Sequence, residues 1–246
     1  MDRSFLSDSA VVAAARDFVC VRLATYESAD EAKFMTSIFR GRTGQLENTV
    51  FTILAPDGKS TLLRPARSPK HTMGSAARLA ESMNGIAKRY PSRKPVQALP
   101  YAADLRRGLN IASCDLQPLV VVVASTPQKR KAIEAMLTPL AWSDAYRGVY
   151  GYATATPKEL DPLSGAQNTD GVLVVFPDSF GVKGAVVARA TGTDKKTLAA
   201  TLAKGVKTFK PKTKDSHAQI QEARRQNLVW ETEIPVTDPH GPGRRR

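Results

Sequence analysis

The chain has 246 residues, 42% of them hydrophobic, which is enough for one large domain or two small ones with ordinary cores. Its 36 basic and 23 acidic residues give a net charge of +13, which favours anionic partners through long-range attraction. No apolar run approaches the ~20 residues that span a bilayer, and the two cysteines and three histidines lack zinc-ligand spacing. The composition therefore favours a soluble globular protein, with no cofactor expected.

The N-terminus and the cysteines bear on the compartment. The first seven residues lack the apolar stretch of a signal peptide, which favours the cytoplasm, although a mature exported protein whose leader has been removed would have the same sequence. Cys20 lies in the middle of a predicted strand and is expected to be a small buried apolar residue. A disulfide between Cys20 and Cys114 is the open alternative.

Residues 7–90 predict a first unit with the order helix, strand, helix, hairpin and helix. An alanine-rich helix over Ser9–Arg16 precedes a strand over Phe18–Thr25. The segment Ser28–Glu31 has the Ser-x-x-Glu form of a capping box and begins a second helix, which Gly41 ends. The apolar face of this helix is formed by Ala32, Met35, Ile38 and Phe39.

The remainder of the first unit is a hairpin and a helix. A strand over Asn48–Leu54 leads through the Pro56–Lys59 turn into a returning strand over Ser60–Arg64. A helix over Ser75–Arg89 carries apolar residues at helical spacing, and Pro91 stops it. We therefore place the first domain at residues 1–92.

A second unit follows a proline-containing stretch. Residues 93–118 are predicted to be a linker with a helix over Ala102–Ala112, whose apolar face indicates that it packs against a domain. The second domain spans residues 119–210. Its continuous valines predict a fully buried strand over Leu119–Ala124, followed by a helix that contains Ile133.

The second unit continues with a strand, a polar loop and the two strands of a hairpin, over Gly148–Thr156, Pro157–Asn168, Gly171–Phe176 and Ala185–Ala190. A turn capped by Thr193 begins the closing helix, which runs to Val206. Residues 211–246 are predicted to form a basic connector, an amphipathic helix over Ser216–Leu228 and a mobile tail.

Residues Leu23–Asp30 resemble the active-site segment of thioredoxins, in which a buried strand runs through Trp-Ala-Thr-Trp-Cys-Gly-Pro-Cys into a helix. Here Tyr26 follows Ala-Thr at the place of the second tryptophan, Glu27 and Asp30 stand at the two thiol positions, and Ser28-Ala29 lies between them. A carboxylate cannot attack a disulfide. The resemblance therefore implies the fold and argues against dithiol exchange at this segment.

The hairpin extends this resemblance. Residues Thr49–Gly58 are similar to the Pro-Thr-x-Phe-Leu-Ile-Asp-Pro-Asp-Gly pattern of thioredoxin-like proteins of the peroxiredoxin and cytochrome-maturation type. The proline of that pattern is the cis-proline that faces the dithiol. Thr49 occupies its place, where a cis bond would cost about 2.5–4 kcal/mol. The second diagnostic element of the redox site is therefore also replaced.

In the second unit, residues 124–130 resemble Ala-x-Cys-Gly-Pro-Cys-Lys, with Ser125 and Gln128 at the thiol places and Pro127 retained. Together the two resemblances imply an α/β protein of two tandem thioredoxin-like domains. Each would have a central mixed sheet flanked by helices and would lack redox residues, with a C-terminal helix and tail beyond them.

Two catalytic interpretations compete with helix capping. Glu27 and Asp30 could act as an acid–base pair, but a helix N-terminus stabilises the ionised form, whereas a general acid must be protonated. Ser125 could be a nucleophile, but the second unit holds no histidine to activate it. A Ser or Thr N-cap before Pro127 is therefore favoured.

The favoured function is non-catalytic binding or scaffolding of a protein or peptide partner, as in the cysteine-free thioredoxin-like domains of protein disulfide isomerases. The groove beside Tyr26–Ala29 and Thr49 is the expected surface. The alternative is a thiol–disulfide or peroxide-type oxidoreductase that uses Cys20 or Cys114 alone. A third, nucleic-acid-associated role follows from the charge, but aromatic residues are not interleaved with the basic segments as in base-stacking modules. The oligomeric state stays open.

Overall fold

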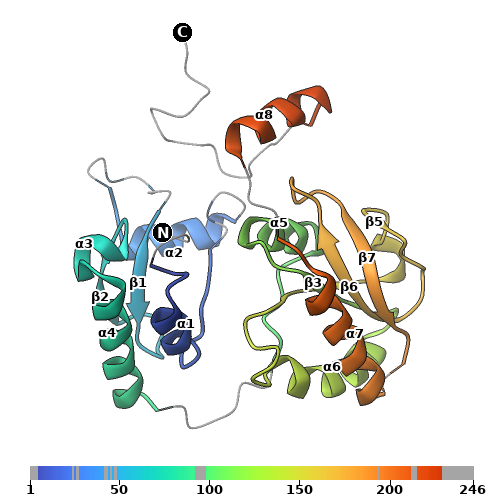
Figure 1. Cartoon of the computed structure of the whole chain (residues 1–246), viewed down its shortest axis with the longest axis horizontal. Coiled ribbons are helices and arrows are strands. Elements are labelled where there is room, and N and C mark those ends of the chain that lie inside the picture. The colour runs from blue at the N-terminus through green and yellow to red at the C-terminus, as the bar shows by residue number, and fades with distance from the viewer. Residues whose placement is uncertain are drawn as a thin grey trace. The chain divides into compact units, whose positions relative to one another are not determined.

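The computed structural model describes residues 5–23, 25, 28–41, 44, 46, 49–91, 98–192, 194–211 and 215–228. Within these residues the chain is a mixed α/β protein with eight α-helices and two sheets (Figure 1). It divides into two compact units, the first comprising the described residues up to 91 and the second those from 98 onwards. No helix in the described part is long and apolar enough to cross a membrane.

The first unit is built around a hairpin and two packed helices. Strands β1 (Phe51–Leu54) and β2 (Thr61–Ala66) pair antiparallel, with Ile53 opposite Leu63. Helix α1 (Ser9–Ala15) lies against α4 (Ala76–Arg89), and a short helix, α3 (Pro69–Met73), joins β2 to α4. The buried core of this unit consists of Phe5, Val11, Ala14, Ile53, Leu63, Leu79, Ala80, Met83 and Ile86.

Local sequence signals explain these helix boundaries. The Asp8 carboxylate accepts the amide hydrogens of Ala10 and Val11 at the start of α1, and the Ser75 hydroxyl caps α4 through the Arg78 amide. Such caps satisfy donors that have no partner within the helix. The hairpin turn is closed by Asp57, which accepts hydrogen bonds from the backbone of Lys59 and Ser60. The predicted helices at both ends of this unit and its hairpin are thus confirmed.

The predicted strand over Phe18–Thr25 is wrong. The described residues of this segment form no strand, and Val19 and Val21 are 72% and 71% exposed. Cys20 is exposed too, which corrects the prediction that it is buried. A strand is stabilised by neighbours on its edges and faces, and among the described residues of this unit the two strands of the hairpin pair only with each other.

Helix α2 (Ala29–Ile38) begins where the capping box predicts, but it contributes no buried residue. Its predicted apolar face, which includes Met35 and Ile38, is only half-buried. The helix ends before Phe39, whose backbone is extended, and therefore earlier than the predicted stop at Gly41.

The second unit contains a five-stranded mixed sheet. Its strands lie in the order β4 (Gly151–Ala155), β3 (Leu119–Val123), β6 (Gly171–Pro177), β7 (Gly184–Ala190) and β5 (Leu163–Ser164). β3 runs parallel to β4 and antiparallel to β6, and β6 and β7 form an antiparallel hairpin. Every residue of the central strand β3 is 0% exposed, so the buried strand predicted from its valines is confirmed.

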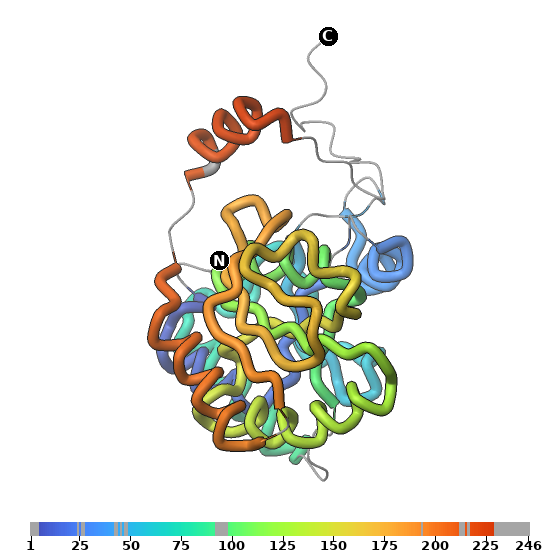
Figure 2. Tube along the Cα trace, turned by 90° about the vertical axis from the view of Figure 1, so that its right-hand side faces the viewer, coloured from blue at the N-terminus to red at the C-terminus, as the bar shows by residue number. Residues whose placement is uncertain are grey.

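Helices cover both faces of this sheet. Because side chains alternate along a strand, Val120 and Val122 lie in one core cluster with α6 (Pro127–Ala141) and α7 (Lys195–Thr208). Val121 and Val123 lie in the opposite cluster with α5 (Leu105–Asp115). The views in Figures 1 and 2 show α7 running beside the β6–β7 hairpin. Helix α5, placed in a linker by the sequence, is thus part of the second unit's core.

Several boundaries in the second unit differ from their prediction. The loop predicted over residues 157–168 contains a 3-10 turn, η1 (Pro157–Glu159), and the edge strand β5. Helix α7 is capped by Asp194, whereas the predicted cap, Thr193, lies outside the described residues. Helix α8 (Ser216–Arg225) is confirmed, and the predicted tail lies outside the described residues. Cys20 and Cys114 are each an exposed free thiol, and they belong to different units, so the alternative of a disulfide between them stays a prediction.

Candidate functional site

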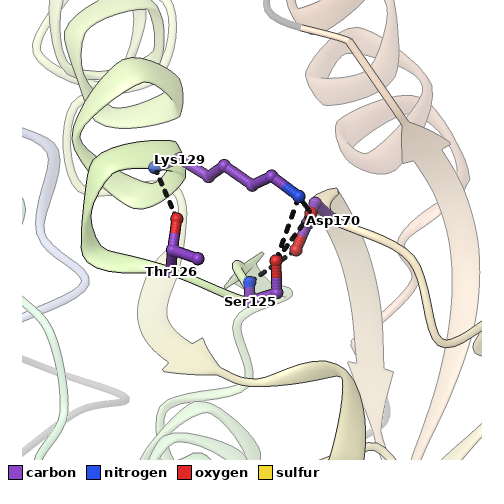
Figure 3. Close-up of polar contacts among 4 residues, drawn as sticks. All are labelled: Ser125, Thr126, Lys129 and Asp170. Carbon is purple, nitrogen blue, oxygen red and sulfur yellow. Dashed lines mark hydrogen bonds and ion pairs between the residues drawn. The ribbon is translucent and has the colours of Figure 1, made fainter.

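The clearest polar cluster among the described residues lies at the junction of β3 and α6 (Figure 3). The backbone amide of Ser125 donates to Asp170 Oδ1 at 2.5 Å, and its hydroxyl donates to Asp170 Oδ2 at 3.0 Å. Lys129 Nζ lies 2.5 Å from the same Oδ2 and donates to Ser125 Oγ at 3.1 Å. The three residues form one closed hydrogen-bonded network.

The sheet register brings these residues together. Val123 of β3 pairs with Gly171 of β6 in an antiparallel ladder, so Asp170 lies beside the end of β3, where the chain turns towards α6. Glycine is required at the next position, because the φ of Gly171 is +151° and a Cβ there would clash with the Ala190 carbonyl oxygen of β7. The sheet therefore fixes the carboxylate opposite the helix start.

The beginning of α6 positions Ser125 and Lys129. Thr126 is the N-cap and accepts the Lys129 amide hydrogen at 3.3 Å, while Pro127 occupies the first helical turn. This confirms the prediction of a Ser or Thr cap before Pro127. One helical turn separates Ser125 from Lys129, which directs the lysine back over the serine.

Electrostatics keep this network ionised. The Lys129 ammonium holds the pKa of the Asp170 carboxyl below its usual value, and the hydrogen bonds from Ser125 act in the same direction. The side chain of Lys129 is 57% exposed and that of Asp170 is 24% exposed, so solvent screens the pair. The cluster therefore fixes the local geometry more than it contributes stability.

The arrangement is poorly suited to catalysis by Ser125. A serine nucleophile needs a neighbouring base that can take its proton. A carboxylate that already accepts three hydrogen bonds, and whose pKa is lowered by them, is a weak base. The network thus supports the structural role of Ser125 over the nucleophilic one.

The other predicted site residues lie at different places. Pro127 and Gln128 are exposed at the start of α6, beside Ser125. In the first unit Ser28 caps α2 by accepting the Glu31 amide hydrogen at 3.4 Å, and Ala29 and Asp30 are exposed in its first turn. Thr49 is half-buried just before β1, whereas Tyr26 and Glu27 lie outside the described residues. Most of the described positions therefore lie at the start of a helix, α2 in the first unit and α6 in the second, whereas Thr49 precedes a strand.

Sequence reasoning missed Asp170 and gave Lys129 no role. The register of the predicted strands was the available signal, because the residue before the hairpin's first strand must lie beside the end of an antiparallel neighbour. The sequence predicted both strands but did not pair them with each other. Pairing is a long-range property that single strands do not specify.

Metal ligation and thiol reactivity are two further kinds of chemistry to consider for the described residues. No group of three His, Cys, Asp or Glu residues in that part of the chain could hold a metal ion. Cys20 donates to the Ala15 carbonyl oxygen at 3.8 Å, and partial desolvation raises the pKa of its thiol, which disfavours the reactive thiolate.

Comparison with known proteins gave no match: no protein-family model, no curated protein and no solved structure is similar to the chain.

Proposed function

We propose that the chain is a non-catalytic binding or scaffold protein whose second unit is thioredoxin-like, and that it recognises a protein or peptide partner. The observation that carries this proposal is the β3–α6 junction. At the place where the thioredoxin resemblance would put a dithiol, the chain has Ser125 and Gln128, and Ser125 belongs to a closed network with Lys129 and Asp170. Such a network fills the site without supplying redox chemistry.

The architecture of the second unit supports the proposal. It has the order strand, helix, strand, hairpin and helix that the resemblance implies, with η1 and the edge strand β5 inserted before the hairpin, and helices cover both faces of the mixed sheet. The start of α6 presents three exposed residues, Thr126, Pro127 and Gln128, at the end of the fully buried β3. Rigid elements thus hold a small exposed surface, which suits recognition.

The single-cysteine oxidoreductase is the competing proposal. It requires an accessible thiol with a lowered pKa. Cys20 is accessible but its thiol pKa is raised, which disfavours Cys20 as the redox thiol of that alternative.

The proposal is tested by placing a photo-crosslinking amino acid at Gln128 of the full chain and irradiating it in an extract of its native cells. We expect one reproducible protein adduct, because Gln128 lies on the exposed helix start. The matched control carries the same amino acid at Lys183, which is exposed in the β6–β7 turn of the same unit.

A partner enriched at Gln128 over Lys183 must then bind the purified chain in a reducing buffer, because recognition without thiols does not depend on oxidation. Equal labelling at both positions, or binding that vanishes on reduction, would contradict the proposal.

A further inference from the structure

A second feature of this unit lies between β7 and α7 and involves a different set of residues. A hollow of about 370 Å³, referred to below as the groove, is lined by Arg189 of β7 and by Lys196 and Lys204 of α7. Two small apolar residues, Ala188 and Ala200, also line it. Figure 2 shows the two elements side by side.

The cations of this groove lack carboxylate partners. Among the described residues neither Lys196 nor Lys204 has an ion pair, and Arg189 donates its Nη2 hydrogen to the neutral Gly165 carbonyl at 3.1 Å. The nearest carboxylate along the chain, Asp194, is directed to the Thr197 amide and hydroxyl, both at 2.7 Å. Three uncompensated positive charges around one hollow focus a positive potential on it.

We propose that this groove binds a small oligophosphate. Two of its three cations are lysines, which bind phosphate as point charges, whereas planar carboxylates favour bidentate arginine. Lys196 and Lys204 are eight residues apart, which places their Cα atoms about 12 Å apart along the helix axis. Their long flexible side chains can converge on successive phosphate groups of one ligand.

The size and lining of the groove argue against a nucleic acid as its ligand. The groove residues include no aromatic side chain on which a base could stack. The hollow is of the size that holds one small molecule. The expected ligand is thus a small molecule that carries a short chain of phosphates. This proposal is independent of the protein-binding role of the β3–α6 junction.

The test is isothermal titration calorimetry of the full chain with inorganic tripolyphosphate at low ionic strength. We expect saturable binding at a single site, which Lys196→Gln/Lys204→Gln weakens by at least about tenfold because two charge-assisted contacts are lost. Both lysines are exposed, so the variant should keep the circular dichroism spectrum of the wild type. The control Lys158→Gln/Lys183→Gln removes the same charge from exposed positions outside the groove and should bind almost as the wild type does.

Absence of saturable binding by the wild type would overturn the proposal. So would equal weakening in the two double variants, since the interaction would then follow net charge alone. A parallel titration with duplex DNA completes the test. If DNA binds through Lys196 and Lys204 while tripolyphosphate does not, the groove is a nucleic-acid surface and the small-ligand proposal fails.

Discussion

Of two segments that the sequence predicts to be buried strands, one is a buried strand in the structure and the other is not. Leu119–Val123 is the fully buried centre of a five-stranded sheet, with β4 on one side and β6 on the other. Phe18–Leu23 forms no strand, and its valines are largely exposed. Both segments precede a helix that begins with a Ser or Thr cap.

The difference shows that a strand depends on its neighbours as much as on its own residues. β3 has a paired strand on each edge and apolar helices on each face. In the first unit the described hairpin pairs only with itself, and α2 contributes no buried residue that could cover a further strand. β propensity expresses packing against neighbours, so it cannot act where the neighbours are missing.

The largest expected effect compares Val122→Asp with Val21→Asp. Val122 is 0% exposed, and a buried carboxylate without a partner should cost at least about 4 kcal/mol and unfold the second unit. Val21 is 71% exposed, so the same change there should alter the free energy of unfolding by less than about 0.5 kcal/mol. Urea unfolding followed by circular dichroism measures both. Comparable losses in the two variants would mean that Val21 is buried after all.

A smaller effect is expected from two glycines inside helices. A Cβ at Gly108 of α5 would lie 2.7 Å from the Ala153 Cβ, so Gly108→Ala should destabilise the second unit by about 1–3 kcal/mol. A Cβ at Gly85 of α4 meets no atom within 4 Å, so Gly85→Ala should stabilise the first unit by about 0.5–1 kcal/mol. Opposite signs in thermal unfolding would confirm that α5 is packed closely on its sheet. Stabilisation by both would contradict it.

Much of the local structure could be predicted from the sequence. The Ser75 and Asp57 signals defined a helix start and a turn, and the valine run defined β3, because these features depend on neighbours within a few residues. The predictions that failed concern contacts between residues far apart in the sequence. Nothing near Phe18–Leu23 records whether partner strands exist, and nothing near Ser125 records that Asp170, 45 residues away, will lie beside it.

Two buried tyrosines, Tyr150 just before β4 and Tyr152 within it, allow a comparison of smaller effects within the second unit. The Tyr150 hydroxyl donates to the Leu202 carbonyl, whereas the Tyr152 hydroxyl is buried without a partner among the described residues. Tyr150→Phe should destabilise by about 0.5–1.5 kcal/mol, because a buried hydrogen bond is lost. Tyr152→Phe should be neutral or slightly stabilising, because it removes an unsatisfied group. Denaturant midpoints distinguish the two, and a clear loss in Tyr152→Phe would show that its hydroxyl has a partner.

The smallest expected effect is the loss of folding stability at low pH that one carboxylate in each unit causes. Hydrogen bonds from the Ser60 hydroxyl and nearby amides lower the pKa of Asp57 to about 2, and Lys129 lowers that of Asp170. Because both folded pKa values lie below the ordinary value of 3.8, the stabilisation from each ionised carboxylate is present above that pH and is lost as the pH falls through its folded pKa, which for Asp57 is about 2. Asp57→Asn and Asp170→Asn should each make the free energy of unfolding depend slightly less on pH in the acid range. The effect is small because solvent screens both groups. Denaturant unfolding at several acid pH values measures this dependence. If the free energy of unfolding of both variants falls with pH as steeply as that of the wild type, the prediction is contradicted.

The most direct test of the non-catalytic proposal is an insulin-reduction assay with dithiothreitol on the wild type, on Ser125→Cys/Gln128→Cys and on Ser125→Cys alone. We predict that the wild type does not accelerate the reaction, because neither helix start carries a thiol pair. The double variant restores the Cys-x-x-Cys spacing at the start of α6 and should gain activity, whereas the single variant should not. Acceleration by the wild type that disappears in Cys20→Ser or Cys114→Ser would contradict the account.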